Sequence, residues 1–586
     1  MFSSLDRIQS SLDRHPWARI AGLGFLPGFL WGLHLALLLF FLNPELPIRG
    51  RLAGALMGLY GVSMGLAGAA GMVLVTRGDL HRARRLLPWG LTLAVALAAL
   101  LSASHASKFA FYLPPGINSR LIKAAILIGA AALILFYTSL LHSFSGRPYG
   151  SRSRLGYILL CLVSLYVMAE RRLAYRIGPV PIRASIPPPT LEPPRLLVVG
   201  IEGATLDALL PLAEQGRVPF LAEVLRSGAT TRLVPLVPHR RLAAWATLAT
   251  GKWPFRHGVT DPRRIRLLPA VGKGELQLLP SGVGFVHWGL LGARPRPVRS
   301  TDQTALGLWQ ILSRRGAGSG LVGWPTAPPM SEELRFALAE GFFSGARNPE
   351  LALPEPVAEQ ARLFQVGLGE LDPVVLGRFG NDPPLPVQEA LAADRWRQGL
   401  SLFLLEQQPD TRALFVSLPG LATVSRLYAG GLEAVQLEGS EDPEDQRAAE
   451  VLAAYYGQLD AFLQELWQRA GEEGLMAVVS PIGFSKPKGL ERFRRWITGG
   501  DAIGGSTAGP PDGMLMLYGD RVSPGARLAD ASTVDLVPTL LYALGYPVAR
   551  DLDGKVLTGA FDTRWRQQQP LAFVPTYENL TTVGER

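Results

Sequence analysis

The stretch LMAVVSPIGF, residues 475–484, contains a run of apolar side chains that ends abruptly. Residues 476–479 show no alternation of polar and apolar positions, which predicts a parallel strand covered on both faces. In open α/β sheets, ligands and catalytic groups gather at the carboxyl ends of such strands. Here the strand leads into Ser480, Pro481 and Ile482. Neither a proline nor an isoleucine side chain can bind a metal ion or move a proton.

Alternating strands and helices are expected on either side of this stretch. Apolar runs predict further strands at 195–203, 318–325, 413–420 and 512–519. Helical patterns lie between them, at 304–316, at 448–471 and from Ser532 or Thr533 to Gly545. Strands separated by helices predict an α/β domain with a mostly parallel central sheet flanked by helices. Two stretches break the alternation and are expected to be surface excursions: the Arg-, Gly- and Pro-rich residues 261–300 and the acidic residues 437–446.

The first third of the chain is far more apolar than the rest. A helix needs about 20 apolar residues to cross a bilayer, and five runs approach or exceed that length, near 18–42, 52–76, 86–104, 123–143 and 155–170. We therefore expect three parts in the chain: a transmembrane anchor of five helices at 1–172, a proline-rich linker at 173–195, and the α/β domain at 196–586.

Arginine in the short connections predicts the orientation. The amino terminus and the second and fourth connections carry more Arg than the first and third, which favours a cytoplasmic amino terminus. Five crossings of a bacterial-type inner membrane would then place the α/β domain on the outer side, in the periplasm or outside the cell. If the short fifth run does not cross, the domain lies inside.

The net charge of +10 is distributed along an Arg-rich chain. The chain has no dense Lys/Arg run of the kind that lines a nucleic-acid groove, so no nucleic-acid partner is expected. The single cysteine, Cys161, lies in the fifth apolar run. A domain without disulfides must be stabilised by its hydrophobic core, and about 390 residues suffice for that.

The chain after the linker resembles the type I phosphodiesterase/nucleotide pyrophosphatase branch of the alkaline phosphatase superfamily. The segments that carry the resemblance keep the order of the family: 198–229, 243–259, 308–326, 456–466, 478–484, 510–517, 531–557 and 575–580. The resemblance implies an alkaline-phosphatase-like fold. It also implies phosphoryl chemistry with two metal ions, usually zinc, and a Thr or Ser nucleophile.

The residues that would perform this chemistry are replaced. At the positions where the family carries its nucleophile and its Asp and His ligands, this chain has Glu202, Arg241, Ala422, Arg426, Pro481, Ile482 and Gly509, with an uncertainty of one residue at Ala422 and Arg426. No histidine follows His287, although every histidine ligand of the family would lie beyond it. The resemblance therefore predicts a degenerate site with no catalytic residue, no metal ligand and no cofactor.

Two arrangements of the degenerate site are open. In the first, Arg241 pairs with Glu202, and Arg426 fills the remaining space to give a sealed polar cluster. In the second, Arg240, Arg241 and Arg426 form a metal-free pocket for an anionic lipid headgroup or a glycan phosphate. A third possibility is an active enzyme with relocated ligands drawn from the carboxylates Asp207, Asp261, Asp501 and Asp512.

Other polar residues have ordinary explanations. His239 is expected to be a loop histidine, and the resemblance gives His257 a structural role. Asp460 and Asp535 are expected to cap helices or form ion pairs. His34 and His142, within or beside the membrane runs, are expected to have packing or helix-end roles.

These observations predict a membrane-anchored, catalytically inactive protein that binds or scaffolds in the cell envelope. Its expected partners are the lipid bilayer, other envelope or membrane proteins, and an anionic lipid or glycan. One alternative is an active metal-dependent phosphodiesterase or phosphotransferase acting on lipid-linked or glycan substrates. The other is an accessory subunit of a membrane complex or transporter.

Overall fold

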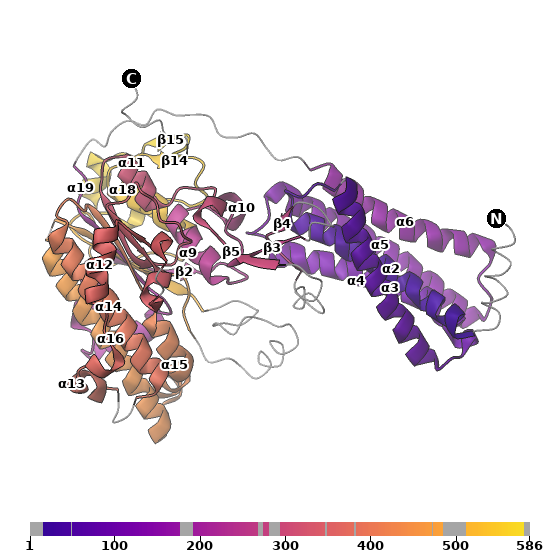
Figure 1. Ribbon diagram of the computed structural model, residues 1–586, viewed down its shortest axis with the longest axis horizontal. Helices are drawn as coiled ribbons and strands as arrows, with labels where there is room; N and C mark the ends of the chain where they lie inside the picture. The colour runs from indigo at the N-terminus through magenta and orange to yellow at the C-terminus, as the bar shows by residue number, and fades with distance from the viewer. Residues whose placement is uncertain are drawn as a thin grey trace. The chain divides into compact units, whose positions relative to one another are not determined.

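The computed structural model describes residues 16–48, 50–175, 192–267, 274–280, 294–345, 348–379, 383–471, 473–484 and 511–578 (Figure 1). Contacts between residues divide the chain into two compact units. The membrane unit comprises Met1–Pro179 together with Arg263–Pro297, and the α/β unit comprises Val180–Pro262 and Val298–Arg586.

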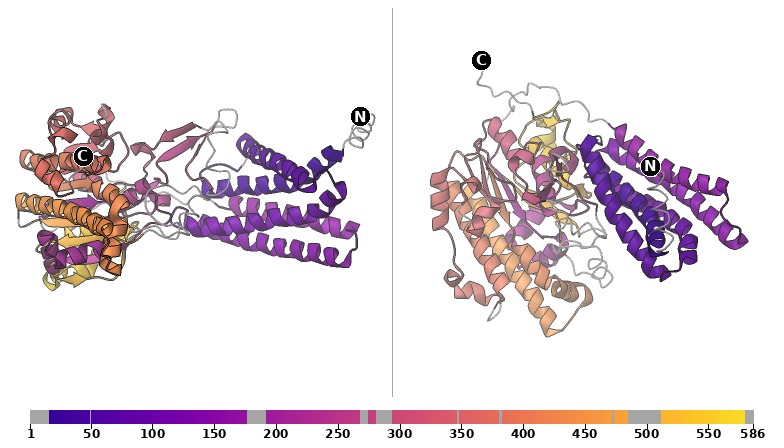
Figure 2. Two further views of the ribbon diagram at one scale, coloured as in Figure 1. Left: turned by 90° about the horizontal axis from the view of Figure 1, so that it is seen from below. Right: turned by 45° about the vertical axis from the view of Figure 1, so that its right-hand side comes forward.

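Five helices of the membrane unit are long and apolar enough to cross a bilayer, as the sequence predicts (Figures 1 and 2). Each begins before and most end after the apolar run that predicts it, because helix formation continues into the flanking polar residues. Their bounds are Pro16–Leu42 (α2), Gly50–Thr76 (α3), Leu80–Lys108 (α4), Pro115–Ser145 (α5) and Ser151–Leu173 (α6).

Glycines bring α2 and α3 into close contact. A Cβ atom added at Gly28 would lie 2.1 Å from the carbonyl oxygen of Met64, and one added at Gly32 would lie 2.2 Å from that of Tyr60. Small residues at such interfaces allow helix backbones to approach within a membrane. The pairing of α2 with α3 therefore depends on the absence of side chains on this face.

We expect Gly28→Leu to disrupt the membrane unit, because its side chain would overlap the backbone of α3. Overpacking costs about 1–3 kcal/mol in well-packed cores, and here the obstacle is backbone that cannot repack. The matched control is Gly58→Leu, which adds the same side chain where nothing lies within 4 Å. Thermal unfolding of the full-length protein in detergent should show a lower midpoint for Gly28→Leu alone. Equal midpoints for both variants would contradict this packing.

Three polar side chains inside the membrane unit, His34, His142 and Arg172, have hydrogen-bond partners. His34 Nε2 lies 3.0 Å from Ser164 Oγ, joining α2 to α6, and His142 Nε2 lies 3.0 Å from Ser153 Oγ. The buried Arg172 donates to the carbonyl oxygens of Phe40, Pro44 and Leu46 at 2.7, 2.6 and 2.8 Å, so it satisfies one acceptor in the last turn of α2 and two in the connection that follows. These contacts fit the packing and helix-end roles expected for the two histidines.

The Arg-rich stretch expected as an excursion of the α/β domain groups with the membrane helices instead. It forms a three-stranded antiparallel sheet in the order β4-β3-β5, where β3 is Arg263–Arg266, β4 is Glu275–Leu276 and β5 is Arg294–Pro297. Asn43 holds it in place: Oδ1 accepts from the backbone N–H groups of Gln277 at 2.7 Å and Leu278 at 3.1 Å, and Nδ2 donates to the Leu278 carbonyl at 2.7 Å.

The α/β unit contains a ten-stranded mixed sheet in the order β12-β2-β11-β10-β1-β9-β6-β7-β8, with β13 paired to β2. The five strands from β10 to β7 are parallel to one another, as the sequence predicts, and antiparallel pairs join β11 to β10 and to β2, and β7 to β8. The strands are Leu196–Ile201 (β1), Ala229–Val234 (β2), Ser319–Trp324 (β6), Phe336–Ala339 (β7), Ala352–Leu353 (β8), Ala413–Leu418 (β9), Leu475–Ser480 (β10), Gly513–Tyr518 (β11), Ala526–Arg527 (β12) and Ala531–Ser532 (β13). A separate pair is formed by Val548–Ala549 (β14) and Phe573–Val574 (β15).

Helices lie on both faces of this sheet (Figure 1). The long helices Leu385–Gln407, Gly420–Glu438 and Pro443–Ala470 gather on one side, where Pro219–Ser227 packs against the last of them. The helices Arg241–Thr250, Leu308–Arg314 and Leu536–Ala543 pack together on the other side. The α-helices are Leu206–Glu214 (α7), Pro219–Ser227 (α8), Arg241–Thr250 (α9), Pro254–His257 (α10), Leu308–Arg314 (α11), Glu355–Leu363 (α12), Pro373–Gly377 (α13), Leu385–Gln407 (α14), Gly420–Glu438 (α15), Pro443–Ala470 (α16), Leu536–Ala543 (α18) and Thr563–Gln568 (α19). Short 3₁₀ turns occur at Ser300–Asp302 (η2), Glu340–Ser344 (η3), Pro349–Leu351 (η4), Leu368–Glu370 (η5), Thr533–Asp535 (η6) and Thr558–Ala560 (η7).

The core of the α/β unit lies along the central strands. Every residue of β1, β9 and β10 is buried, which explains why these strands read as continuous apolar runs without alternation. Because β1, β9 and β10 are parallel neighbours, their carboxyl ends lie along one edge of the sheet. Glu202, Gly420 and Pro481 follow at that edge.

Candidate functional site

The carboxyl end of β10 is closed by its own backbone. Ser480 Oγ donates to the Ile482 carbonyl at 2.7 Å and accepts from the Gly203 N–H at 3.1 Å. Pro481 and Ile482 are buried, and Gly483 forms a parallel bridge with Gly203. The residues after β10 therefore link it to the end of β1.

An ion cluster stands at the carboxyl end of β1. Glu202 directly follows β1, Arg241 is the first residue of α9, and Glu340 directly follows β7. Arg241 Nε donates to both oxygens of Glu202 at 2.8 Å, and its two terminal nitrogens donate to Glu340 at 2.7 and 2.5 Å. Of the two arrangements expected from the sequence, the structure has the pairing of Arg241 with Glu202, and it adds Glu340 as a second carboxylate.

Burial makes this cluster electrostatically strong. The Glu202 side chain is 4% exposed, and burial raises its pKa while the charge of Arg241 opposes that rise. Burial pushes the pKa of Arg241 down, but the attraction of Glu202 and the bonds to Glu340 outweigh it, so the pKa of Arg241 lies above its usual value. The guanidinium therefore stays charged, and its charge is neutralised by its two carboxylate partners.

A second buried group continues the cluster on α14. Asp394 accepts from the Gly420 N–H at 3.1 Å and from the Tyr455 hydroxyl at 2.9 Å. Arg397, one helical turn later, donates to the Ala393 carbonyl at 2.9 Å, and its guanidinium lies 4.3 Å from the centre of the Phe343 ring. Burial raises the pKa of Asp394 to about 6.

The raised pKa of Asp394 predicts a pH dependence of stability. Between pH 4 and 6 the carboxyl ionises in the unfolded chain while it stays protonated in the folded one, so its contribution to stability is lost as the pH rises through about 6. The shift from 3.8 to about 6 corresponds to up to about 3 kcal/mol. Asp394→Asn should therefore gain stability relative to the natural protein as the pH rises from 4 to 6. Denaturant unfolding at several pH values checks this, and parallel curves for the two proteins would contradict it.

The remaining arginines of the expected anion pocket do not join Arg241. Arg240 pairs with Asp261, and Arg426 is exposed on α15, where it donates to the Ala422 carbonyl at 3.3 Å and to Thr423 Oγ1 at 3.2 Å. Ala422 is buried. The expectation that Arg426 fills the former site is wrong, because the side chain folds back on its own helix. Gly509 and Asp501 lie outside the described residues.

Three of the other polar residues singled out in the sequence, His257, Asp460 and Asp535, have structural partners. The pKa of His257 is lowered to about 3 by burial, and its Nε2 lies 3.0 Å from Thr247 Oγ1. Burial lowers the pKa of His239 to about 4, so both histidines are neutral at neutral pH. Asp460 accepts from two N–H groups at the start of α8, and Asp535 accepts from the N–H groups of Ser532 and Lys555.

Two of the carboxylates considered as relocated ligands are held near β2. Asp207 forms a bidentate ion pair with Arg232, in which Arg232 Nη1 lies 2.9 Å from Asp207 Oδ2. Burial raises the pKa of Asp512, and the negative charge of Asp530 adds to this effect. Asp207 and Asp512 therefore lie in the electrostatic surroundings of one arginine on β2, away from the Arg241 cluster that follows β1 and β7.

A family profile described as type I phosphodiesterase / nucleotide pyrophosphatase matches residues 196–501, more than half of the chain. The chain belongs to this family. None of the curated proteins matches it.

Solved structures of the same superfamily resemble this family member at low identity. They include an inactive form of murine ectonucleotide pyrophosphatase/phosphodiesterase 5 with AMP, at 12% identity, 63% and 100% coverage of the two chains and a TM-score of 0.36. A mutant of the alkaline phosphatase PafA is 12% identical, with 64% of this chain and 100% of that chain covered and a TM-score of 0.35. Phosphonoacetate hydrolase from Sinorhizobium meliloti 1021 is 14% identical, with 56% of this chain and 67% of that chain covered and a TM-score of 0.31.

The described residues at the strand ends do not fit a pair of zinc ions. Zinc needs several Asp, Glu, His or Cys donors with available lone pairs. Glu202 is the only such donor among the described family positions, and both of its oxygens accept hydrogen bonds from Arg241. Among the described residues, no group of three or more His, Cys, Asp or Glu side chains lies close enough to hold a metal ion.

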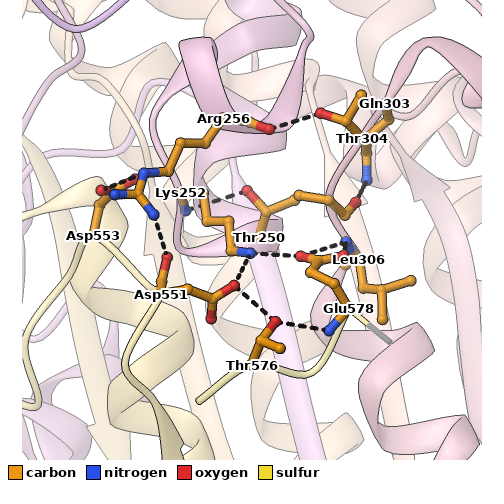
Figure 3. Close-up of polar contacts among 12 residues, drawn as sticks. Thr250, Lys252, Arg256, Gln303, Thr304, Leu306, Asp551, Asp553, Thr576 and Glu578 are labelled. Atoms are coloured by element: carbon orange, nitrogen blue, oxygen red, sulfur yellow. Dashed lines mark hydrogen bonds and ion pairs between the residues drawn. The ribbon is translucent and has the colours of Figure 1, made fainter. Parts of the chain in front are cut away.

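A further ion cluster in this family member joins the turn after α9 to Asp551 and Glu578 (Figure 3). The buried Lys252 donates to Asp551 at 2.8 Å and to Glu578 at 2.6 Å. Thr576 also donates to Asp551, and the Leu306 N–H donates to Glu578 at 3.1 Å. This cluster fixes residues 576–578 against the turn that follows α9.

Sequence reasoning missed Glu340, Asp394, Arg397 and Lys252. Glu340 directly follows the apolar residues of β7, so the rule that functional groups stand at strand ends would have found it had that short strand been recognised. Asp394 and Arg397 lie inside a helix whose polar pattern gives no indication that they are buried.

Proposed function

We propose that this chain is a membrane-anchored, non-catalytic member of its family that acts as a binding or scaffolding subunit in the cell envelope. The observation that carries the proposal is the Glu202–Arg241–Glu340 cluster. The cluster supports loss of two-metal phosphoryl transfer because the guanidinium of Arg241 binds both oxygens of Glu202, the carboxylate that follows β1.

The chemistry at this edge of the sheet supports the same proposal. A two-metal phosphodiesterase stabilises the attacking and the leaving oxygen with cations and needs an activated hydroxyl between them. Here the residue in the nucleophile position is an arginine whose Nε donates to Glu202 and whose two terminal nitrogens donate to Glu340. The end of β10 carries Pro481 and Ile482. No group at these positions can attack a phosphorus atom.

The proposed location follows from the five apolar helices and the distribution of arginine. With a cytoplasmic amino terminus, an odd number of crossings puts the α/β unit on the opposite side of the inner membrane. A surface on that side would be available to other envelope or membrane proteins, or to an anionic glycan.

Zinc content and hydrolysis test the proposal together. Purified full-length protein, dialysed against zinc and then against metal-free buffer, should retain far less than one zinc per chain. It should hydrolyse bis(4-nitrophenyl) phosphate no faster than the matched variant Glu202→Gln. Two zinc ions per chain, with turnover lost in Glu202→Gln and kept in the surface control Arg426→Gln, would overturn the proposal and establish the active phosphodiesterase instead.

A further inference from the structure

A cavity of about 390 Å³ lies in the α/β unit beside the carboxyl end of β1. One wall is a single face of α15, because Ser425, Ala429 and Gln436 recur there at helical spacing. Helix α16 and the residues that follow β1 supply the other walls. Among the described residues that line the cavity, none belongs to the ion cluster of Glu202. Its volume is within the range of about 300–1,000 Å³ that small-molecule sites occupy.

Two side chains of the cavity carry hydrogen-bond donors without acceptors. Tyr456 on α16 is 2% exposed, and the only hydrogen bond that its hydroxyl makes to a described residue is the one it accepts from the Thr205 N–H at 3.4 Å. Its proton is therefore left to donate. Gln436 Nε2 is buried and has no hydrogen-bond partner. Because unpaired buried donors cost free energy, a ligand in this cavity must offer acceptors to both groups.

Much of the remaining wall is apolar. Leu432 on α15 and Leu452 on α16 are buried, and Phe484 after β10 adds an aromatic ring. The ring lies against Gly203: a Cβ atom added at that glycine would lie 2.6 Å from Phe484 Cδ2, so the absence of a side chain leaves room for the ring. The cavity thus combines an apolar surface with a few polar groups, the usual composition of a small-molecule site.

The charges of the lining disfavour an anion. The charged side chains that line the cavity are the carboxylates Asp207 and Glu433, and no described Arg, Lys or His lines it. A phosphate or a carboxylate would approach like charges without a cation in the wall. A purely hydrocarbon chain would leave the donors of Tyr456 and Gln436 unpaired. What remains is a neutral ligand with oxygen acceptors and an apolar face.

We propose that this cavity binds a neutral sugar unit of a glycan. The C–H faces of a sugar ring are apolar and pack against the Phe484 ring and the two leucines, while its oxygens accept hydrogen bonds from the Tyr456 hydroxyl and the Gln436 amide. Any charged group of the glycan lies outside the cavity. This assignment names a ligand class for the binding role proposed above and rests on that proposal.

Saturation-transfer NMR on the full-length protein in phosphatidylcholine nanodiscs tests the assignment. The probes are cellobiose and N,N′-diacetylchitobiose, with glucuronic acid and adenosine for comparison. At least one of the two neutral disaccharides should bind, and Tyr456→Phe should weaken that binding about fivefold because one hydrogen bond is lost. The matched control Tyr428→Phe makes the same change on α15 outside the lining and should leave the affinity unchanged.

A second variant fills the cavity. Ala429→Phe should abolish binding, whereas Leu427→Phe, at an exposed position of the same helix, should not. Absence of binding by both disaccharides, or an unchanged affinity in Ala429→Phe, would overturn the assignment, as would tighter binding of glucuronic acid or adenosine. Zinc content and hydrolysis are measured on the same preparation. If the protein retains no zinc, is inactive and binds neither disaccharide, the assignment fails while the proposed non-catalytic role stands.

Discussion

Replacing Arg241 with methionine is expected to lower the free energy of unfolding of the α/β unit by about 3–5 kcal/mol. Methionine has a similar length and no charge, so the change removes the hydrogen bonds to Glu202 and Glu340 with little loss of volume. Glu202 is 3% exposed and would then be a buried carboxylate without its cation. Chemical denaturation of the purified full-length protein, followed by the fluorescence of the α/β unit, measures the loss.

The partner variants show whether the loss comes from the ion cluster. Removing both charges in Glu202→Leu/Arg241→Met should recover much of the stability, since a buried ion pair replaced by apolar groups is often neutral. Arg426→Met, on the surface of α15, should change the free energy of unfolding by no more than about 0.5 kcal/mol. If Arg241→Met is as stable as the natural protein, the cluster does not hold the end of β1 as described.

Replacing Lys252 with methionine is expected to have a comparable effect, about 3–5 kcal/mol, for the same physical reason. Lys252 is 7% exposed and is the cation between Asp551 and Glu578, so its removal leaves two largely buried carboxylates facing each other (Figure 3). The carboxyl-terminal segment should detach first. Limited proteolysis should therefore cleave near residues 570–578 faster in Lys252→Met.

The matched control for this prediction is Lys555→Met, which removes an exposed lysine from the same part of the α/β unit. Its proteolysis and its free energy of unfolding should match those of the natural protein. Equal cleavage rates in Lys252→Met and Lys555→Met would show that the cluster does not hold residues 576–578 in place.

The fold was largely predictable because its signals are local. The buried strands β1, β9 and β10 are continuous apolar runs, and the membrane helices exceed the length that a bilayer requires, so hydropathy alone locates them. The antiparallel direction of β11 was not predicted. It depends on the path of the chain between β10 and β11, and an apolar run carries no information on strand direction.

The site was predictable only in part, because side chains far apart in the sequence complete it. Glu202 and Arg241 were singled out because they occupy the family positions after the first strand and at the nucleophile. Opposite charges at neighbouring positions of one site are expected to pair, and these two do. The prediction for Arg426 was wrong. The sequence places Arg426 on a helix but does not determine which side of that helix faces the sheet, and in the structure Arg426 lies on the exposed side of α15. The sheet β3–β5 was read as a surface excursion because its contact with the end of α2 depends on the Asn43 amide and on the packing of Leu276 against Leu35 and Leu39. Neither contact has a signature in the sequence.

The most direct test of the central claim is a crystal structure of the full-length protein soaked with zinc, with data collected at the zinc absorption edge. The account predicts continuous density for the Arg241 guanidinium between Glu202 and Glu340 and no anomalous peak at the carboxyl end of β1. An anomalous peak bound to Glu202, with the Arg241 side chain turned away, would contradict it.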